Sequence, residues 1–280
     1  MRFIGILLFL SLSFNCQSSC VGDNKTKERI YSFYVVPQLA LSETYFSWVS
    51  VLDHVGKELG LCFELNVPQT IPSFEQDLKI GKADFAFMNP YHLLASNRSQ
   101  GYIPIIADAK DNLSGIIVIK KNSAISKIQD LNGQRIAFPA PNALAASLLI
   151  RAHLANYNIQ IFPEYVKSHS NVYRSVINGD VSAGGGIHKT FMLESKQLQS
   201  ELKILFETPQ YMPHPIAVHP RVALRTRQSF SSTLIGLSKD PKKTVNLDAI
   251  QIPNPREVNF KDYEYLKKLG LEKFAEKVGG

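Results

Sequence analysis

Short apolar runs alternate with longer segments of helical periodicity along almost the whole chain. In the first half, Ile30 to Val36 is a strand candidate, and Tyr45 to Leu59 carries apolar residues at helical spacing before Gly60 ends it. The same order returns later, where a strand over Arg135 to Phe138 precedes a helix over Ala143 to Ala155. This alternation is typical of sheets joined by crossover helices, so we expect an α/β protein.

Two breaks interrupt the alternation. The first is the polar segment from Asp108 to Asn112, and the second is a proline-rich segment from Pro209 to Pro220. The chain is long enough for two lobes, so we expect it to cross between lobes at these two breaks. Each lobe is then a mixed, mainly parallel sheet flanked by helices. The predicted division is a leader over residues 1–16, a first lobe over residues 28–112 and 215–280, and a second lobe over residues 113–214.

The first residues have the pattern of an export leader. A short positive start precedes an apolar stretch, Phe3 to Leu12, that is too short to cross a bilayer as a stable helix. Cleavage before Cys16 leaves its thiol for lipid attachment, so we expect a lipid-anchored protein of the periplasm or cell envelope. Ordinary cleavage near Ser18 or Ser19, with the cysteines incidental or disulfide-linked, stays open. In either case Cys62, between two apolar residues, favours a buried core thiol.

Charge and motif content exclude several classes of function. The formal net charge is +7, but Lys and Arg are scattered among Asp and Glu, which favours small anions as partners and argues against nucleic acid. No pair among the seven histidines combines helical ligand spacing with a supporting carboxylate, so we expect no metal site. No nucleophile elbow and no suitably placed cysteine is present, so we expect neither catalysis nor a cofactor.

Two segments join the end of a predicted strand to the start of a predicted helix. They are Phe87 to His92 in the first half and Phe138 to Ala143 in the second. Open α/β sheets bind ligands at such strand ends, and free N–H groups at a helix start favour an anion. Asn89 and Asn142 are therefore candidate contacts, although both are equally consistent with simple helix caps. The binding interpretation requires that the two segments face one cleft between the lobes.

A glycine-rich segment, Gly179 to Gly186, is predicted to be a turn. It is not a nucleotide-binding loop, because His188 and not glycine precedes the lysine. Its consecutive glycines allow a ligand to approach the backbone, and a turn without any partner is an equal alternative. Shortly before it, His169 precedes a helix start at Asn171, so it is either a ligand contact or a structural cap of that turn.

Four short motifs follow one another in a specific order and spacing. They are Gly81 to Phe87, the strand Gly115 to Ile119 with the polar residues after it, Asp130 to Gly133, and Ser168-His169. In this order they resemble the phosphate/phosphite/phosphonate-binding proteins of ABC importers, the PhnD-like family, over nearly all of the mature chain. The resemblance implies a type II periplasmic-binding fold with two hinge crossings, whose lobes close on a ligand and deliver it to a membrane permease.

The residues that hold a phosphonate in that family are absent here. Where the family places a Ser-Thr-Ser run at a helix start, this chain has Ala143-Leu144-Ala145, and the acid expected after His169 is Ser170. An oxyanion oxygen left without a donor costs on the order of 1 to 3 kcal/mol, so these losses weaken the assignment of a phosphonate as ligand. Backbone N–H groups from Asn142 onward remain able to hold an oxyanion.

The resemblance implies an extracytoplasmic solute-binding protein of an ABC-type importer. We expect it to bind a small anionic ligand of the phosphate or phosphonate class as a monomer, and to meet the membrane only through its lipid. A sensing module that signals to a membrane kinase is the alternative, and the altered pocket fits it somewhat better. The candidate ligand-binding residues are Tyr45, Asn89, Pro90, Tyr91, Asn142, Ala143, Ser147, His169, Ser170, Gly184, Gly185 and Tyr211.

Overall fold

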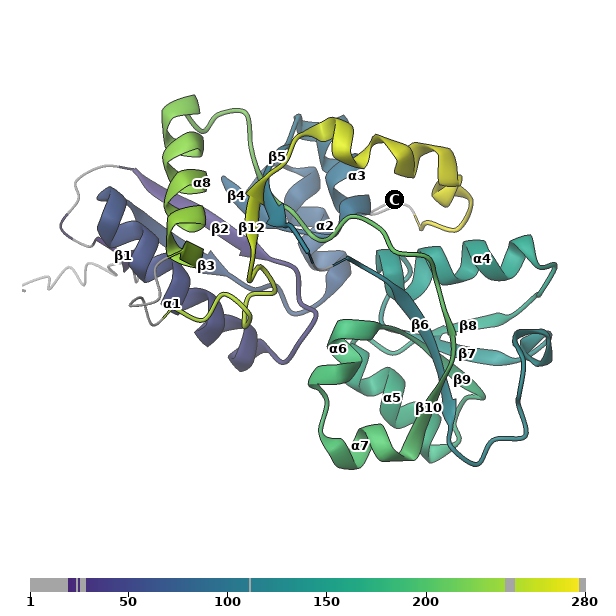
Figure 1. Cartoon of the computed structure of the whole chain (residues 1–280). Helices are drawn as coiled ribbons and strands as arrows, with labels where there is room; N and C mark the ends of the chain where they lie inside the picture. The colour runs from purple at the N-terminus through teal and green to yellow at the C-terminus, as the bar shows by residue number, and fades with distance from the viewer. Residues whose placement is uncertain (1–19, 24, 26–28, 111, 240–244, 277–280) are drawn as a thin grey trace, which may run out of the picture.

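The computed structural model describes residues 20–23, 25, 29–110, 112–239 and 245–276. The predicted leader and its lipid-attachment residue, Cys16, lie outside these residues. The described chain forms two sheets in two lobes, with the first lobe at the upper left of Figure 1 and the second at the lower right. The α/β class and the two-lobed arrangement, both predicted from the alternation of elements, are confirmed.

The first lobe is built on a seven-stranded sheet with the order β1-β3-β2-β4-β11-β5-β12. Strand β2 is parallel to β3 and β4, whereas β11 lies antiparallel between β4 and β5. Strands from both ends of the described chain therefore share one sheet. The bounds are β1 Val21–Gly22, β2 Ile30–Val35, β3 Cys62–Asn66, β4 Phe85–Phe87, β5 Ile103–Asp108, β11 Ile216–Val218 and β12 Pro255–Glu257.

Helices of the first lobe begin and end at signals that the local sequence carries. Asn89 accepts a hydrogen bond from the backbone N–H of His92 at 2.8 Å, and Pro90 is the first residue of α3, as predicted. Helix α1 ends at Gly60, whose φ of 66° is left-handed. The helices are α1 Leu41–Leu59, α2 Ile71–Lys79, α3 Pro90–Gln100, α8 Leu224–Lys239 and the 3-10 segments η3 Phe260–Leu269 and η4 Leu271–Lys273.

Aromatic rings fill the core of the first lobe between the sheet and α8. Phe33, Phe63 and Phe85 come from three neighbouring strands, and Phe230 of α8 packs against all three, with ring centroids 4.9 to 6.2 Å apart. All four side chains are fully buried. This cluster fixes the central strands, and so it also fixes the carboxyl end of β4, from which α3 begins.

The second lobe is built on a five-stranded sheet with the order β10-β6-β9-β7-β8. Strand β7 is parallel to β8 and β9, and β6 is antiparallel to β9 and β10. The strands are β6 Gly115–Lys120, β7 Arg135–Phe138, β8 Phe162–Tyr165, β9 Ala183–Ile187 and β10 Leu202–Glu207. The helices are the 3-10 turn η1 Ile128–Leu131, the π-helical segment η2 Leu144–Leu149, α4 Ile150–Asn156, α5 His169–Asn178, α6 His188–Leu193 and α7 Lys196–Glu201.

The predicted glycine-rich turn is wrong over its second half. Gly184, Gly185 and Gly186 lie in β9, which is buried in the middle of the second sheet. A side chain at Gly185 would overlap the carbonyl oxygen of Ala146 in η2, and one at Gly115 would overlap that of Ala145. Glycine at these positions therefore lets the backbone of η2 lie directly against the sheet. The close backbone approach expected at the glycines exists, but the approaching group is a helix of the same lobe.

Two further helix predictions differ from the structure. The helix expected over Ala143 to Ala155 begins as the π-helical segment η2 and becomes an α-helix only at Ile150. The helix expected over Thr190 to Leu198 is split into α6 and α7, because Glu194 adopts an extended conformation and Ser195 then caps α7 by accepting from the backbone N–H of Leu198. The first difference accompanies the close packing of η2 on the sheet, and the second comes from the local cap at Ser195; helical periodicity encodes neither.

Two chain segments connect the lobes, at the breaks that the sequence showed. They join β5 to β6 and β10 to β11, and they run side by side with a bridge between Leu113 and Tyr211. Thr208 and Gly115 add two hydrogen bonds at the base of this ladder, at 2.8 and 2.9 Å. Paired crossings of this kind form a hinge about which two lobes can rotate.

Cys62 forms a disulfide with Cys20, so the prediction of a free core thiol is wrong. The two residues are 42 positions apart, and their Cα atoms lie 5.5 Å apart because β1 is antiparallel to β3. This bond ties the start of the described chain to the sheet of the first lobe. Disulfides of this kind form and persist in oxidising compartments outside the cytoplasm.

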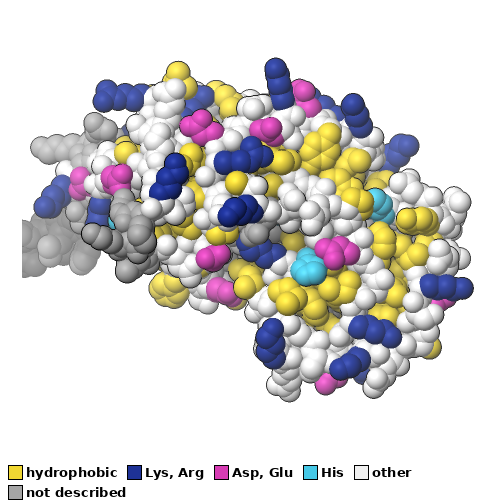
Figure 2. Space-filling view, viewed as in Figure 1, with side chains coloured by type: hydrophobic (Ala, Val, Ile, Leu, Met, Phe, Trp, Pro, Cys, Tyr) yellow, Lys and Arg dark blue, Asp and Glu magenta, His cyan; other side chains and the backbone are white. Residues whose placement is uncertain are grey.

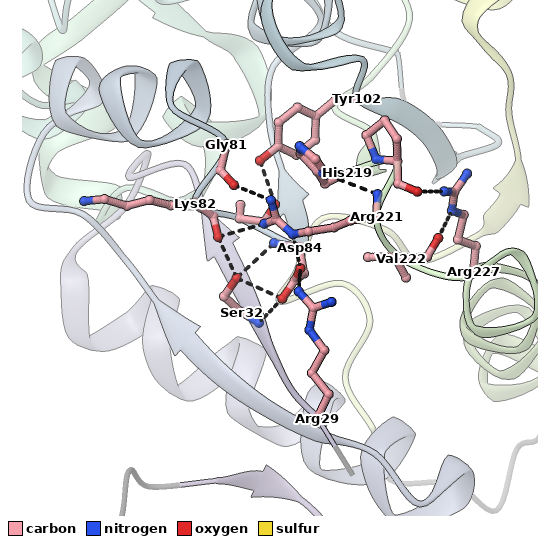
Figure 3. A network of polar contacts seen from close by, with 12 residues as sticks. Arg29, Ser32, Gly81, Lys82, Asp84, Tyr102, His219, Arg221, Val222 and Arg227 are labelled. Atoms are coloured by element: carbon pink, nitrogen blue, oxygen red, sulfur yellow. Dashed lines mark hydrogen bonds and ion pairs between the residues drawn. The ribbon is translucent and has the colours of Figure 1, made fainter.

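A network of polar contacts surrounds Asp84 at the start of β4 (Figure 3). The buried carboxylate accepts from Arg29 Nη2 and from Arg221 Nε, each at 2.6 Å, and from the backbone N–H of Ser32 at 3.0 Å. Arg221 also donates to the carbonyl oxygens of residues 81 and 82. The network joins β2, β4 and the segment after β11, at the end of β4 opposite to the start of α3.

Candidate ligand-binding site between the lobes

The start of η2 provides free backbone N–H groups at the edge of the second lobe. Among the residues that the structure describes, none accepts a hydrogen bond from the backbone N–H of Leu144, Ala145 or Ala146. These three residues are buried, with exposed fractions of 0 to 1%. Helix starts with unpaired N–H groups favour anions, because the amides and the helix dipole both present positive charge. Because η2 runs directly into α4, the two form one continuous helical element.

Asn142, two residues before η2, contacts the first lobe with its side chain and its backbone. Its carbonyl oxygen accepts from Asn89 Nδ2 at 3.3 Å, and its Nδ2 donates to Glu75 Oε2 at 3.3 Å. Its Nδ2 also donates to the carbonyl oxygen of Glu276, and its Oδ1 accepts from the backbone N–H of Glu276, both at 2.9 Å. Asn142 is therefore not a helix cap, whereas Asn89 both caps α3 and reaches across to the other lobe.

A buried carboxylate and an imidazole lie beside this contact. Glu75 Oε1 lies 2.9 Å from His92 Nε2, so the Nε2 of His92 donates to the carboxylate. The two side chains are 8% and 2% exposed. The other ring nitrogen of His92, Nδ1, is buried and has no hydrogen-bond partner in the part of the chain that the structure describes. Buried polar atoms without a partner are rare in folded proteins. This nitrogen is therefore either a contact for a ligand or an atom that is shielded from water because the two lobes meet around it.

A further buried histidine, His214, lies close enough to His92 and to the buried His169 for both to affect its pKa. His169 is the first residue of α5 in the second lobe, and His214 precedes β11 in the first. Burial lowers the pKa of His169 to about 4. Burial lowers the pKa of His214 to about 3, with smaller contributions from His92, His169 and Lys189. Both rings are therefore neutral at pH 7, and imidazoles of the two lobes are close enough to influence one another.

A cavity of about 490 Å³ lies at the same junction. Its walls come from α2, α3, η4, the segment after η4 and Asn142 of the second lobe. Volumes of this size are typical of sites for small molecules. The polar and charged side chains that line it include Glu75, Tyr91, His92, Arg98, Asn142 and Glu276.

Five of the sequence-predicted candidates meet at or beside the junction. Asn89, Pro90 and Tyr91 form the start of α3, and Asn142 and Ala143 form the approach to η2. The expectation that both strand-end segments meet between the lobes agrees with the hydrogen bond between Asn89 and Asn142. All five are buried except Tyr91, which is half-buried.

His169 and Ser147 are buried in the second lobe. The Nδ1 of His169 has no hydrogen-bond partner among the described residues, which keeps it a candidate contact. The hydroxyl oxygen of Ser147 accepts from Arg151 Nε at 3.1 Å, within the same helical element. Ser147 thus has a partner one turn along the helix and not across the junction.

The remaining candidates lie apart from this cluster. Tyr45 is on the first turns of α1 and packs edge to face with its neighbour Phe46. Ser170 donates to Glu194 Oε1 at 2.6 Å, and Tyr211 lies on the hinge with its hydroxyl 3.0 Å from His153 Nε2. Gly184 faces Val172, and Gly185 faces Phe138 and the carbonyl oxygen of Ala146, all within the second lobe. Ligand contact at these positions is therefore not supported by their surroundings.

Sequence reasoning missed four residues of the junction, Glu75, His92, His214 and Glu276. His92 stood in the segment already singled out, and its place in the first turn of a capped helix is a signal that could have identified it. Glu75 lies on the buried stripe of α2 with Ile71, Phe74 and Leu78, and a carboxylate at that helical spacing is a signal that could have identified it. Glu276 follows the last helical segment and carries no local signal, since its partner Asn142 is 134 residues away in the chain.

The paired hinge segments and the helix starts that meet between two α/β lobes define a type II periplasmic binding protein. More narrowly, the chain belongs to the family described as ABC transporter, phosphonate, periplasmic substrate-binding protein, whose model matches residues 33–263. No curated protein sequence matches the chain. Among the described residues, no helix is both long enough and apolar enough to span a membrane.

Solved structures share the fold at low sequence identity. A binding protein component of an ABC phosphonate transporter from Pseudomonas aeruginosa is 12% identical, with a TM-score of 0.77 over 87% of this chain and 86% of that one. PhnD1 from Prochlorococcus marinus, in complex with methylphosphonate, is 15% identical, with a TM-score of 0.79 over 87% of this chain and 98% of that one. A protein from Xanthomonas citri bound to a chloride ion is 15% identical, with a TM-score of 0.73 over 88% of this chain and 98% of that one. At these identities the likeness shows the fold alone.

Proposed function

We propose that this chain is the extracytoplasmic solute-binding protein of an ABC importer and that it holds a small oxyanion between its lobes. The observation that carries the proposal is the set of unpaired N–H groups at Leu144, Ala145 and Ala146, beside the place where the lobes meet. A solved relative in complex with methylphosphonate and the family description both support this class of ligand.

The ligand is held mainly by neutral groups. The Ser-Thr-Ser hydroxyls of the phosphonate binders are replaced by Ala143-Leu144-Ala145, so backbone amides supply the donors there. The buried imidazoles of His169 and His214 are neutral at pH 7, because burial lowers their pKa. Preorganised amides at a helix start stabilise an anion without a full counter-charge. The excess of Lys and Arg is spread over both lobes on the face shown in Figure 2, where it attracts anions from a distance.

Closure converts binding into transport. The ligand enters between open lobes, the lobes rotate about the paired crossings, and closure removes it from water. The permease then recognises the closed form, in which both lobes present fixed surfaces. No covalent step is required, and the proposal assigns no catalytic residue.

The proposal is tested with two variants at one position. Leu144→Pro removes one N–H donor and is compatible with the first residue of a helix after the extended Ala143. Leu144→Ala loses a similar amount of buried side chain but keeps the donor. Thermal-shift titration of the leaderless protein with methylphosphonate, phosphite, phosphate and sulfate gives the apparent affinity. We expect Leu144→Pro to bind its best ligand about 10 to 100 times more weakly than Leu144→Ala. We call the unpaired N–H groups of Leu144, Ala145 and Ala146 the anion seat. Equal affinity of the two variants contradicts binding of the ligand at this anion seat.

A sensing module is the second candidate, and the missing family hydroxyls favour it. In that case the closed form signals to a membrane kinase and does not deliver its ligand. Deleting the gene and measuring uptake of the ligand that binds best separates the two: loss of uptake supports transport, and normal uptake with loss of a transcriptional response supports sensing.

We propose that the mature chain is exported, that it carries a lipid on Cys16 and that it is a monomer. Of the three cysteines in the sequence, Cys20 and Cys62 pair with each other, which leaves Cys16 for lipid attachment. We expect Cys16→Ala to move the protein from the membrane to the soluble fraction, and Cys20→Ala to leave it with the membrane. Unchanged partitioning of Cys16→Ala contradicts lipid attachment at that residue, and light scattering of the leaderless protein tests the monomer.

A further inference from the structure

The segment after η4 belongs to the first lobe by sequence but contacts the second lobe. In Figure 1 the yellow helical segments η3 and η4 pass over α3, and the chain after them turns back above α4. At its end, the backbone N–H and carbonyl oxygen of Glu276 pair with Oδ1 and Nδ2 of Asn142, both at 2.9 Å. The side-chain amide of Asn142 thus pairs with both backbone groups of Glu276, as the backbone of a neighbouring strand would. The contact depends on the backbone of Glu276 and not on its carboxylate.

The first lobe holds this segment firmly. Tyr265 accepts from the backbone N–H of Met212 at 2.8 Å, and Tyr263 donates to the carbonyl oxygen of Pro213 at 3.2 Å. The rings of Tyr265 and Tyr211 stack at 6.1 Å. The tyrosine contacts thus join η3 to one of the two hinge segments. Since Tyr263 and the buried Leu271 anchor η3 and η4, the end of the segment keeps its place relative to the first lobe.

Asn142 makes all its interlobe bonds only when the lobes are together. Its four bonds reach Asn89, Glu75 and, twice, Glu276, all in elements of the first lobe. Rotation about the hinge carries Asn142 away from every one of these partners at once. The same residue lies two positions before the unpaired N–H groups of η2, so it couples lobe closure to the position of the proposed anion seat.

We propose that Asn142 and the backbone of Glu276 form a clasp that holds the lobes closed. Asn142 is a positioning residue, because it acts through the lobe arrangement and through η2. Loss of the two bonds to Glu276 shifts the ratio of closed to open protein by about 5- to 30-fold toward the open form. The role in ligand retention rests on the proposed function, but the clasp itself operates without any ligand.

The clasp is tested by measuring the distance between the lobes without ligand. Spin labels are placed on exposed helix positions by Lys57→Cys in α1 and Lys196→Cys in α7, in leaderless protein with its disulfide intact. Glu276→Pro removes the N–H donor, whereas Glu276→Ala keeps both backbone groups and is the matched control. A second pair consists of two truncated proteins: one ends at Ala275 and lacks both bonds to Asn142, and the other ends at Glu276 and keeps them. Pulsed electron paramagnetic resonance then gives the distribution of distances.

The two variants of each pair are expected to differ in their distribution of interlobe distances. Glu276→Pro and the chain ending at Ala275 gain a population with a longer interlobe distance, while Glu276→Ala and the chain ending at Glu276 keep the parent distribution. Equal melting temperatures within each pair show that folding is not the cause. The same distribution in all variants overturns the clasp. Because no ligand is added, this result is separate from Leu144→Pro, which tests the anion seat.

Discussion

The side-chain amide of Asn89 in the first lobe lies 3.3 Å from the backbone carbonyl oxygen of Asn142 in the second. Each residue follows the carboxyl end of a strand, β4 and β7, and precedes a helical element. In open α/β sheets these edges are where ligands bind. The hydrogen bond shows that the two edges face one another across the junction, so a ligand held at either would contact both lobes.

Asn89 has two roles that substitution can separate. Asn89→Ser keeps a side-chain oxygen for the N–H of His92 but is too short to reach Asn142, whereas Asn89→Ala loses both contacts. We expect Asn89→Ala to lower the free energy of unfolding by about 1 to 2 kcal/mol, and Asn89→Ser to lower it by less than half of that amount. Urea unfolding measures both. Equal losses would mean that the cap contributes nothing to stability.

Acid is expected to destabilise the protein through its buried imidazoles. The folded pKa values of His169 and His214, about 4 and about 3, lie below the ordinary 6.5, so unfolded chains bind protons that the folded protein does not. Stability is therefore complete above about pH 6.5 and is lost as the pH falls toward about 4, by about 1.4 kcal/mol per pH unit for each ring. Urea unfolding at several pH values between about 6.5 and 5 measures the slope.

The slope is assigned to these rings by substitution. His169→Gln removes one titrating group, so its stability should fall less steeply with acid, by about 1.4 kcal/mol per pH unit. His54→Gln, on the partly exposed surface of α1, controls for the replacement of a histidine by glutamine. If His169→Gln keeps the parent slope, its imidazole is not neutral in the folded protein.

The disulfide between Cys20 and Cys62 should contribute measurably to stability. It closes a loop of 42 residues, which restricts the unfolded chain and stabilises the fold by about 3 to 4 kcal/mol. Reduction is therefore expected to lower the melting temperature by on the order of 10 °C. The double variant Cys20→Ala, Cys62→Ala should melt at the temperature of the reduced protein and should not respond to reductant. A melting temperature that reductant leaves unchanged in the parent argues against the bond.

Local patterns were sufficient to predict most elements and one half of the junction. The Asn89-Pro90 pair determines the start of α3 through a cap and a proline, both of which act within one helical turn. The strand over Arg135 to Phe138 was predicted at its observed bounds, since polar residues precede its short apolar run and Pro139 follows it. Signals of this kind depend on neighbours in the sequence, so they can be interpreted without the fold.

Contacts between distant parts of the chain could not be predicted in this way. Gly185 looked like part of a turn because the sequence does not show that η2 lies directly above it in the folded lobe. Cys62 looked like a core thiol because its partner depends on the pairing of β1 with β3. Glu276 carries no pattern at all, since only its backbone makes the contact with Asn142.

The network around Asp84 is expected to stabilise the first lobe without affecting the junction. Its carboxylate is 5% exposed and lies between Arg29 and Arg221, whose side chains are 50% and 31% exposed. Asp84→Ala leaves both guanidinium groups without this partner and should lower the free energy of unfolding by about 3 kcal/mol, as for other broken buried pairs. Arg29→Ala, which removes the more exposed partner, should cost about 1 kcal/mol or less.

The location of Asp84 makes this prediction specific. Asn89 lies five residues further along the chain, roughly 15 Å away at the other end of β4. Asp84→Ala should therefore lower stability in urea while leaving the interlobe distance of the spin-labelled protein unchanged. Glu276→Pro should do the opposite, with a changed distance and nearly parental stability. A longer interlobe distance in Asp84→Ala would show that the start of β4 is coupled to closure, since the strand would then transmit the disturbance along its length to α3.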